Sequence, residues 1–138
     1  MSGSREAGQA IVEMALTFLI FIVLIFAIID GARLAFSYNT VSNAAREGTR
    51  YAIVHGSQST SPIGPGVNES SLTDHVKKYV SSFAASDVTV VPNWPSSSNG
   101  PGSKVKVKVD YTFHFAAASL IGINTVKLSS VNTMVIVN

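Results

Sequence analysis

One long apolar stretch dominates the first third of the chain. Residues 14–29 include no charged side chain, and Ile11 and Val12 extend the run toward the N-terminus. As a helix rising about 1.5 Å per residue, such a stretch spans the roughly 30 Å of hydrocarbon in a bilayer. It exceeds the apolar core of about 7–15 residues in a secretory signal. The pattern predicts a membrane-spanning helix, although Ala32 and Ala35 after the run leave a secretory cleavage site open as an alternative.

The helical pattern continues beyond the apolar stretch and becomes two-sided. No proline occurs before Pro62, so nothing in the sequence forces the helix to stop earlier. At 100° per residue, an apolar stripe and a polar stripe fall on opposite sides. The apolar stripe comprises Leu34, Tyr38, Val41, Ala45, Gly48 and Ala52, and the polar stripe comprises Asn39, Asn43, Arg46, Glu47 and Arg50. We predict one helix over residues 9–54, membrane-spanning in its first half and amphipathic in its second.

The remaining sequence predicts a short helix and three strands. Ser71 followed by Asp74 is a variant of the capping box and predicts a helix from residue 71 to about residue 85. Strands are expected at 87–91, 104–115 and 126–137, with a bulge near Ser129 and Ser130 where the apolar phase slips. The apolar loop 116–123 is expected to cover one end of the core or to contact a neighbouring subunit or the membrane.

The strand at 104–115 carries the clearest alternation in the chain. Its odd positions from Val105 to Phe115 are valine or aromatic, and its even positions are lysine, Asp110, threonine or histidine. One face is therefore expected to be buried and the other wet. The lysine row at 104, 106 and 108 indicates a solvated face, with contact to an anionic surface as an alternative. The predicted class is α+β, a long N-terminal helix packed on a small antiparallel sheet of about three strands.

Composition and charge exclude several functions. The net charge of +2 is scattered over 138 residues without a basic run, so nucleic-acid binding is not predicted. There are no cysteines, which removes disulfides and thiolate sites. His55, His75 and His114 lack metal-ligand spacing and are expected to be solvated. No nucleophile-elbow motif or phosphate-binding loop is found, so neither a cofactor, a metal nor an enzymatic activity is predicted.

Glu13 stands out because it lies inside the start of the apolar helix. A carboxylate at the bilayer centre costs about 2.5–3.5 kcal/mol. One explanation is that Glu13 lies near the interface and turns back toward water. However, Gly8 stands just before the apolar run, and Glu13 is the fifth residue after it.

The spacing from Gly8 to Glu13 resembles a class III prepilin signal. The resemblance implies that a prepilin peptidase cuts between Gly8 and Gln9, leaving Glu13 one helical turn from the new amine. In a staggered helical bundle, Glu13 of one subunit would then pair with the amine of a neighbour and neutralise two charges that are costly in lipid. The leader 1–8 carries Arg5, Glu6 and the chain amine, which favours a cytoplasmic N-terminus.

Three segments of the helix carry a further resemblance: Gly8-Gln9-Ala10-Ile11-Val12-Glu13, Ile29-Asp30-Gly31-Ala32-Arg33-Leu34 and Ala44-Ala45-Arg46-Glu47-Gly48-Thr49-Arg50-Tyr51-Ala52. With these segments, residues 8–54 resemble the TadE-like family of Tad pilus pseudopilins. A departure is Gly31 followed by Ala32, where the family often has an aromatic residue and then glycine. The resemblance implies a minor pilin acting in Tad-type pilus biogenesis and surface adhesion. Its implied partners are other pilin subunits, the prepilin peptidase, the inner-membrane assembly platform and membrane lipid.

The expected organisation has three parts. Residues 1–8 form a prepilin leader, 9–33 a transmembrane and assembly helix, and 34–138 an extracytoplasmic pilin-like domain. The chain is expected in the cytoplasmic membrane with its N-terminus inside, and in an extracellular pilus after assembly. Two alternatives remain: a single-pass membrane-anchored binding domain that is not polymerised, and a secreted domain released by a signal peptidase.

Overall fold

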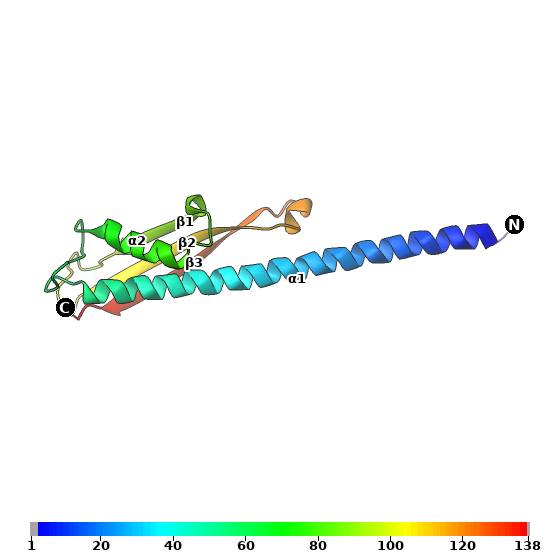
Figure 1. The fold of residues 1–138 in the computed structure, drawn as a ribbon. Coiled ribbons are helices and arrows are strands. Elements are labelled where there is room, and N and C mark those ends of the chain that lie inside the picture. Colours follow the sequence, from blue (N-terminus) through cyan, green and yellow to red (C-terminus); the bar gives the residue numbers. More distant parts are fainter. Residues whose placement is uncertain (1–2, 138) are drawn as a thin grey trace. The chain divides into compact units, whose positions relative to one another are not determined.

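The computed structural model describes residues 3–137, except for the side chains of residues 3–6, 120 and 121. In chain order the elements are α1 (Gly3–Val54), α2 (Glu69–Tyr79), η1 (Ala85–Asp87), β1 (Val88–Asn93), β2 (Lys104–His114), η2 (Ala118–Ile121) and β3 (Thr125–Val135) (Figure 1). The predicted α+β class is confirmed, with a long N-terminal helix packed on a three-stranded antiparallel sheet.

The chain divides into two compact units. One unit holds α1 up to Leu34 together with His114–Thr125. The other holds Ala35–Phe113 and the chain from Val126 onward. The first unit therefore pairs the apolar helix with the loop between β2 and β3, and the second contains the sheet and its core.

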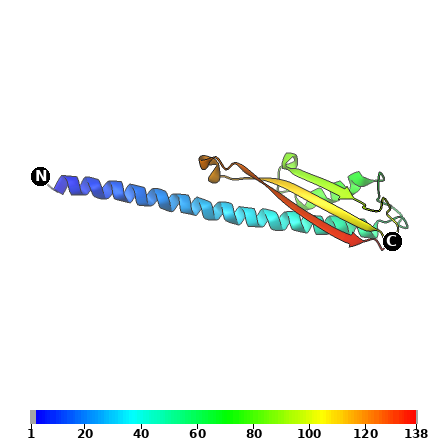
Figure 2. The same ribbon diagram turned by 180° about the vertical axis from the view of Figure 1, so that it is seen from behind.

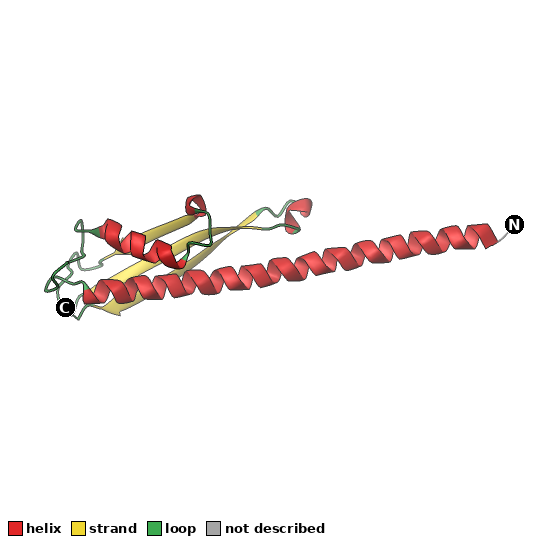
Figure 3. Cartoon of the chain, viewed as in Figure 1, coloured by secondary structure: helices red, strands yellow, loops and turns green. Residues whose placement is uncertain are grey.

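α1 begins earlier than the sequence predicts. The expected start was near Gln9, whereas helical structure already begins at Gly3 and runs through Gly8 (Figure 3). The intervening residues include no proline, so the helix continues without a break. Its end at Val54 agrees with the prediction, and Gly56 follows shortly after.

The second half of α1 packs on the sheet through small side chains. Its fully buried positions include Val41, Ala44, Ala45, Thr49 and Ala52. The hydroxyl of Thr49 donates to the carbonyl oxygen of Ala45 at 2.7 Å, so its polar atom is satisfied inside the core.

The predicted stripe was wrong at Tyr38, whose side chain is 52% exposed. Ser37 is buried instead, and Ala44 joins the core. α1 packs against both α2 and the sheet, whose residues belong to one buried cluster with it. The buried face of α1 is therefore wider than the predicted stripe and includes Ala44. Gly48 lies on this buried face, close to Val76 of α2 and Val107 of β2.

The sheet has the order β1-β2-β3, with β2 in the centre (Figure 2). β1 and β2 pair antiparallel from Val88 opposite Tyr111 to Asn93 opposite Lys106. The predicted alternation of β2 is confirmed at Val105, Val107, Val109 and Phe113, all of which are buried. Val105, Val107 and Val109 belong to one buried cluster with residues of α1 and α2.

β3 keeps one unbroken alternation where the sequence suggested a bulge. From Leu128 to Val135 the side chains alternate regularly between half-buried and exposed. Ser130 lies on the inner side, where its hydroxyl approaches that of Ser42 of α1 at 3.4 Å. Val131 and Val135 point outward and are about half exposed. The apparent phase slip therefore reflects polar side chains on the inner face and valines on the outer face, not an extra residue.

α2 begins at Glu69, two residues before the predicted capping box at Ser71. Its N-cap is Asn68, whose backbone is left-handed with φ 51° and whose side chain makes no capping hydrogen bond. Asparagine tolerates this conformation better than most residues. The helix also ends early, at Tyr79. Phe83, expected within the helix, lies after it and stacks on Tyr111 with ring centroids 4.1 Å apart.

Asp110 is the exception to the wet face predicted for β2. The residue is only 6% exposed, and its carboxylate lies 3.0 Å from the ammonium of Lys108 and 3.1 Å from that of Lys127 on β3. Burial raises the pKa of Asp110, but hydrogen bonds from Ser129, Lys108 and Lys127 outweigh it and leave the pKa below its ordinary value. The carboxylate therefore links β2 to β3 as an anion.

Replacing Asp110 with asparagine is expected to lower the free energy of unfolding by about 1 kcal/mol at neutral pH. The loss is modest because both lysines reach water. A lowered pKa means that the stabilisation is complete above the ordinary value near pH 4 and is lost as pH falls through the folded value. Urea midpoints measured from pH 6 to about pH 2 should fall steeply for the native chain and less steeply for Asp110→Asn. The exposed Asp74→Asn serves as control, and an unchanged slope in Asp110→Asn would contradict the assignment.

Candidate assembly site on the N-terminal helix

The three residues singled out by the sequence lie on one exposed segment of α1. Gly8, Gln9 and Glu13 are all exposed, and a side chain built on Gly8 would meet no other atom within 4 Å. Gln9 and Glu13 are one helical turn apart, so they share a face of the helix. Gly8, Gln9 and Glu13 therefore lie on an exposed helical segment of the folded chain.

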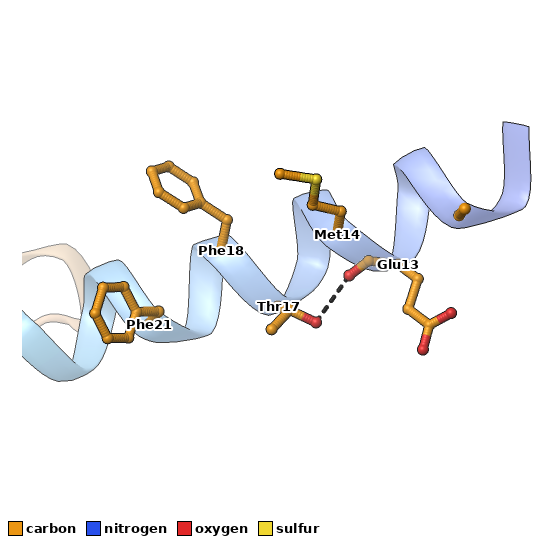
Figure 4. A pocket seen from close by; sticks show the side chains of 6 residues that line it. Glu13, Met14, Thr17, Phe18 and Phe21 are labelled. Atoms are coloured by element: carbon orange, nitrogen blue, oxygen red, sulfur yellow. Dashed lines mark hydrogen bonds between the residues drawn. The ribbon is translucent and has the colours of Figure 1, made fainter. Parts of the chain in front are cut away.

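Glu13 borders a shallow groove on the helix surface. The groove is lined by Ala10, Glu13, Met14, Thr17, Phe18 and Phe21 (Figure 4). Within it, the hydroxyl of Thr17 donates to the carbonyl oxygen of Glu13 at 2.9 Å. The carboxylate extends away from Met14 and Phe18, and among the side chains described here none forms an ion pair with it. The groove thus combines apolar rings with one unneutralised carboxylate.

The surface around Glu13 is almost entirely apolar and exposed. Met14 is 74% and Phe18 61% exposed, and the most apolar window of α1 has no buried residue. Within residues 3–137, α1 is the one helix long and apolar enough to cross a membrane. An exposed surface of this kind requires lipid or another apolar partner. The helix is therefore a candidate membrane anchor.

Asp30 closes the apolar stretch and holds a distant loop. Its carboxylate accepts hydrogen bonds from the backbone N–H of Ala116 at 3.1 Å and of Ala117 at 2.8 Å. The guanidinium of Arg33 donates to the same carboxylate at 3.0 Å. Asp30 itself is buried. The sequence alone predicts no role for Asp30, because its partners are backbone groups far along the chain that leave no pattern in the residue types.

Two of the three histidines are packed, which corrects the expectation that they are solvated. His75 of α2 stacks on Tyr51 of α1 with ring centroids 4.0 Å apart. The ring centroid of His55 lies 4.1 Å from that of Tyr51. The Nδ1 of His55 lies 2.7 Å from the carbonyl oxygen of Tyr51. Burial, Lys78 and His55 lower the pKa of His75, although Glu47 acts in the opposite direction. The cluster joins α2 to α1 while His75 is neutral.

Acidification is expected to loosen the contact between α2 and α1. The unfolded chain takes up a proton at His75 near pH 6.5, whereas the folded chain does so only at lower pH, so stability falls as pH drops through this window. The Tm should fall by a few degrees between pH 7.5 and pH 5. His75→Phe keeps the stacking and should reduce this fall, which calorimetry at both pH values would measure. Equal pH dependence in native and variant chains would exclude His75 as the cause.

Metal binding finds no support in the described part of the chain. No three histidine, aspartate or glutamate side chains there come together as a possible metal site.

These features define an α+β protein with an exposed apolar N-terminal helix as its candidate membrane anchor. Residues 8–50 match the model of the family described as TadE-like protein, which confirms the resemblance found in the sequence. The family is structural and non-enzymatic, and the match indicates a Tad pilus-associated protein. No curated protein and no solved structure gives a significant match to the chain.

Proposed function

We propose that the chain is a minor pilin of a Tad-type pilus. It is inserted with its N-terminus in the cytoplasm, cleaved between Gly8 and Gln9 by a prepilin peptidase, and packed helix against helix into the pilus or its base. One observation carries the proposal: an exposed carboxylate at Glu13 that makes no ion pair with any described side chain, five residues after Gly8, on an apolar helix within the segment that matches the TadE-like family. The sheet domain supports a minor role by family analogy, since major pilins of this system are little more than the helix.

In this proposal, pairing of the Glu13 carboxylate with a neighbour's N-terminal amine favours assembly. Before cleavage, Glu13 stands alone at the edge of the hydrocarbon, where an unpaired carboxylate is costly. Cleavage creates an amine at Gln9, one turn away on the same helix, and a staggered neighbour brings this amine to Glu13. Pairing removes both costs at once, and the apolar groove around Glu13 accepts the neighbouring helix. Surface adhesion by the assembled pilus belongs to the same proposal.

The first test is the N-terminal sequence of the protein from cells with and without the candidate prepilin peptidase. We expect a start at Gln9 that disappears when the peptidase is absent. A start at Met1 or Ser2 in both strains would contradict processing and favour the unpolymerised single-pass anchor. A start beyond residue 30 would instead identify the apolar stretch as a secretory signal.

Glu13→Ala is expected to reduce incorporation into pili at least about tenfold while leaving cleavage after Gly8 intact, because the charge pair is lost but the cut site is not. Immunoblots of sheared pili and of membranes would measure both quantities. Thr17→Ala is the matched control, since it alters the same groove and removes no charge. Equal incorporation of the two variants would show that the carboxylate has no part in assembly.

A further inference from the structure

We infer that the loop between β2 and β3 is a second membrane contact, which lies in the boundary between headgroups and hydrocarbon on the outer leaflet. The inference rests on the proposed membrane insertion of α1 and adds a surface to it. The loop comprises residues 115–124 and includes η2 (Ala118–Ile121). It belongs to the same compact unit as the apolar part of α1.

The position of the loop follows from its attachment to Asp30. Asp30 ends the apolar run that begins near Glu13, and a helix rises about 25 Å between these residues, close to the thickness of the hydrocarbon core. With Glu13 at the inner boundary, Asp30 lies at the outer one. The backbone N–H groups of Ala116 and Ala117 are hydrogen-bonded to this carboxylate. The loop is therefore held at the level where the helix leaves the hydrocarbon.

The composition of the loop suits this level. From Phe115 to Val126 the sequence has no charged residue, whereas His114 precedes it and Lys127 follows it. Ile123 is 51% exposed, and Val126 is partly exposed as well. An uncharged segment with an exposed isoleucine, attached at the end of a membrane-spanning helix, offers apolar surface to the lipid boundary.

The loop also forms internal backbone hydrogen bonds, which a segment in contact with lipid needs because lipid offers few partners. Phe115 N–H donates to the carbonyl oxygen of Asn124 at 3.0 Å, and Ile123 N–H donates to that of Ala118 at 3.0 Å. Gly122 N–H donates to the carbonyl of Ser119, whose hydroxyl donates to that of Ala116 at 2.8 Å. With the two amides on Asp30, backbone N–H groups at both ends of the loop have acceptors within the chain. Backbone that touches lipid must meet this requirement, whereas a loop in water need not.

The test uses single cysteines, since the chain has none of its own. Ile123→Cys, Val23→Cys and Ser96→Cys are labelled with an environment-sensitive fluorophore, and the full chain is reconstituted in phosphatidylcholine and phosphatidylglycerol vesicles. Spin-labelled lipids quench the fluorophore at shallow or deep positions. Val23 lies on exposed apolar helix and tests insertion itself, while Ser96, exposed in the loop between β1 and β2, serves as the aqueous control.

The label at residue 123 is expected to be quenched by shallow spin labels at least roughly threefold more strongly than the label at 96, and the label at 23 by deep spin labels. Quenching at 23 with none at 123 would overturn the inference and leave the membrane helix standing. A blue-shifted but unquenched label at 123 would overturn it too, because the loop would then be buried against a second subunit. No quenching at 23 would refute membrane insertion, and with it the basis of both proposals.

Discussion

Gly48→Val is expected to destabilise the sheet domain by about 3 kcal/mol. A Cβ at position 48 collides with the side chain of Val76 on α2 and lies 3.2 Å from Cγ1 of Val107 on β2. Valine is stiff at its first side-chain torsion, so neither neighbour can turn away freely. The gain in helix propensity over glycine, about 0.4 kcal/mol, is too small to offset the displacement of two elements.

Urea unfolding in detergent, followed by the fluorescence of the buried Trp94, would measure this loss. Trp94 is the single tryptophan of the chain, so its signal reports the sheet domain alone. The matched control is Gly31→Val on the same helix, where an added Cβ would meet nothing within 4 Å and stability should change by less than about 0.5 kcal/mol. If the two variants unfold at the same urea concentration, the close approach of α1, α2 and β2 at Gly48 is refuted.

Asp30→Ala is expected to release the loop between β2 and β3. The backbone N–H groups of Ala116 and Ala117 lose their acceptor, and no other side chain of the loop replaces a carboxylate. Hydrogen exchange at these two amides should accelerate on the order of tenfold or more. Exchange measured by mass spectrometry on the detergent-solubilised chain would show the change in the peptide that covers the loop.

Arg33→Gln is the control for this experiment. It removes the ion pair with Asp30 but leaves the carboxylate in place for the two amides, so exchange in the loop should stay within about twofold of the native rate. Unchanged exchange in Asp30→Ala would mean that the loop is held by other contacts. Acceleration in both variants would instead show that Arg33 is needed to hold the carboxylate toward the loop.

The sequence predicted what depends on periodicity. The apolar run and the absence of proline predicted α1, and the strict alternation from Val105 to Phe113 predicted the buried face of β2. The spacing from Gly8 to Glu13 placed the candidate site on α1. The apolar run and the alternation repeat over many residues, so one deviating residue does not change the predicted element.

What the sequence missed depends on contacts between distant residues. Asp110 lies in the polar phase of β2 and was expected to be exposed. It is buried because Lys127 on β3 forms an ion pair with its carboxylate. His75 is packed because Tyr51 of another helix offers a ring to stack on. Asp30 holds backbone amides 86 and 87 residues away. In each case the deciding partner lies far along the chain and has no fixed spacing, so residue types alone do not reveal it.

The inner face of β3 mixes polar and apolar side chains, so both kinds of contact set the register of the strand. Sliding the strand by one residue would exchange its faces, turning its outer valines inward and Ser130 and Asn132 outward. The inner face also carries Leu128 and Met134, and the fully buried Ile136 continues it, so hydrophobic burial favours the observed register. Polar contacts add to this preference: the hydroxyls of Ser42 and Ser130, and the ion pair of Lys127 with Asp110. A slipped strand is therefore disfavoured both by the core and by these polar groups.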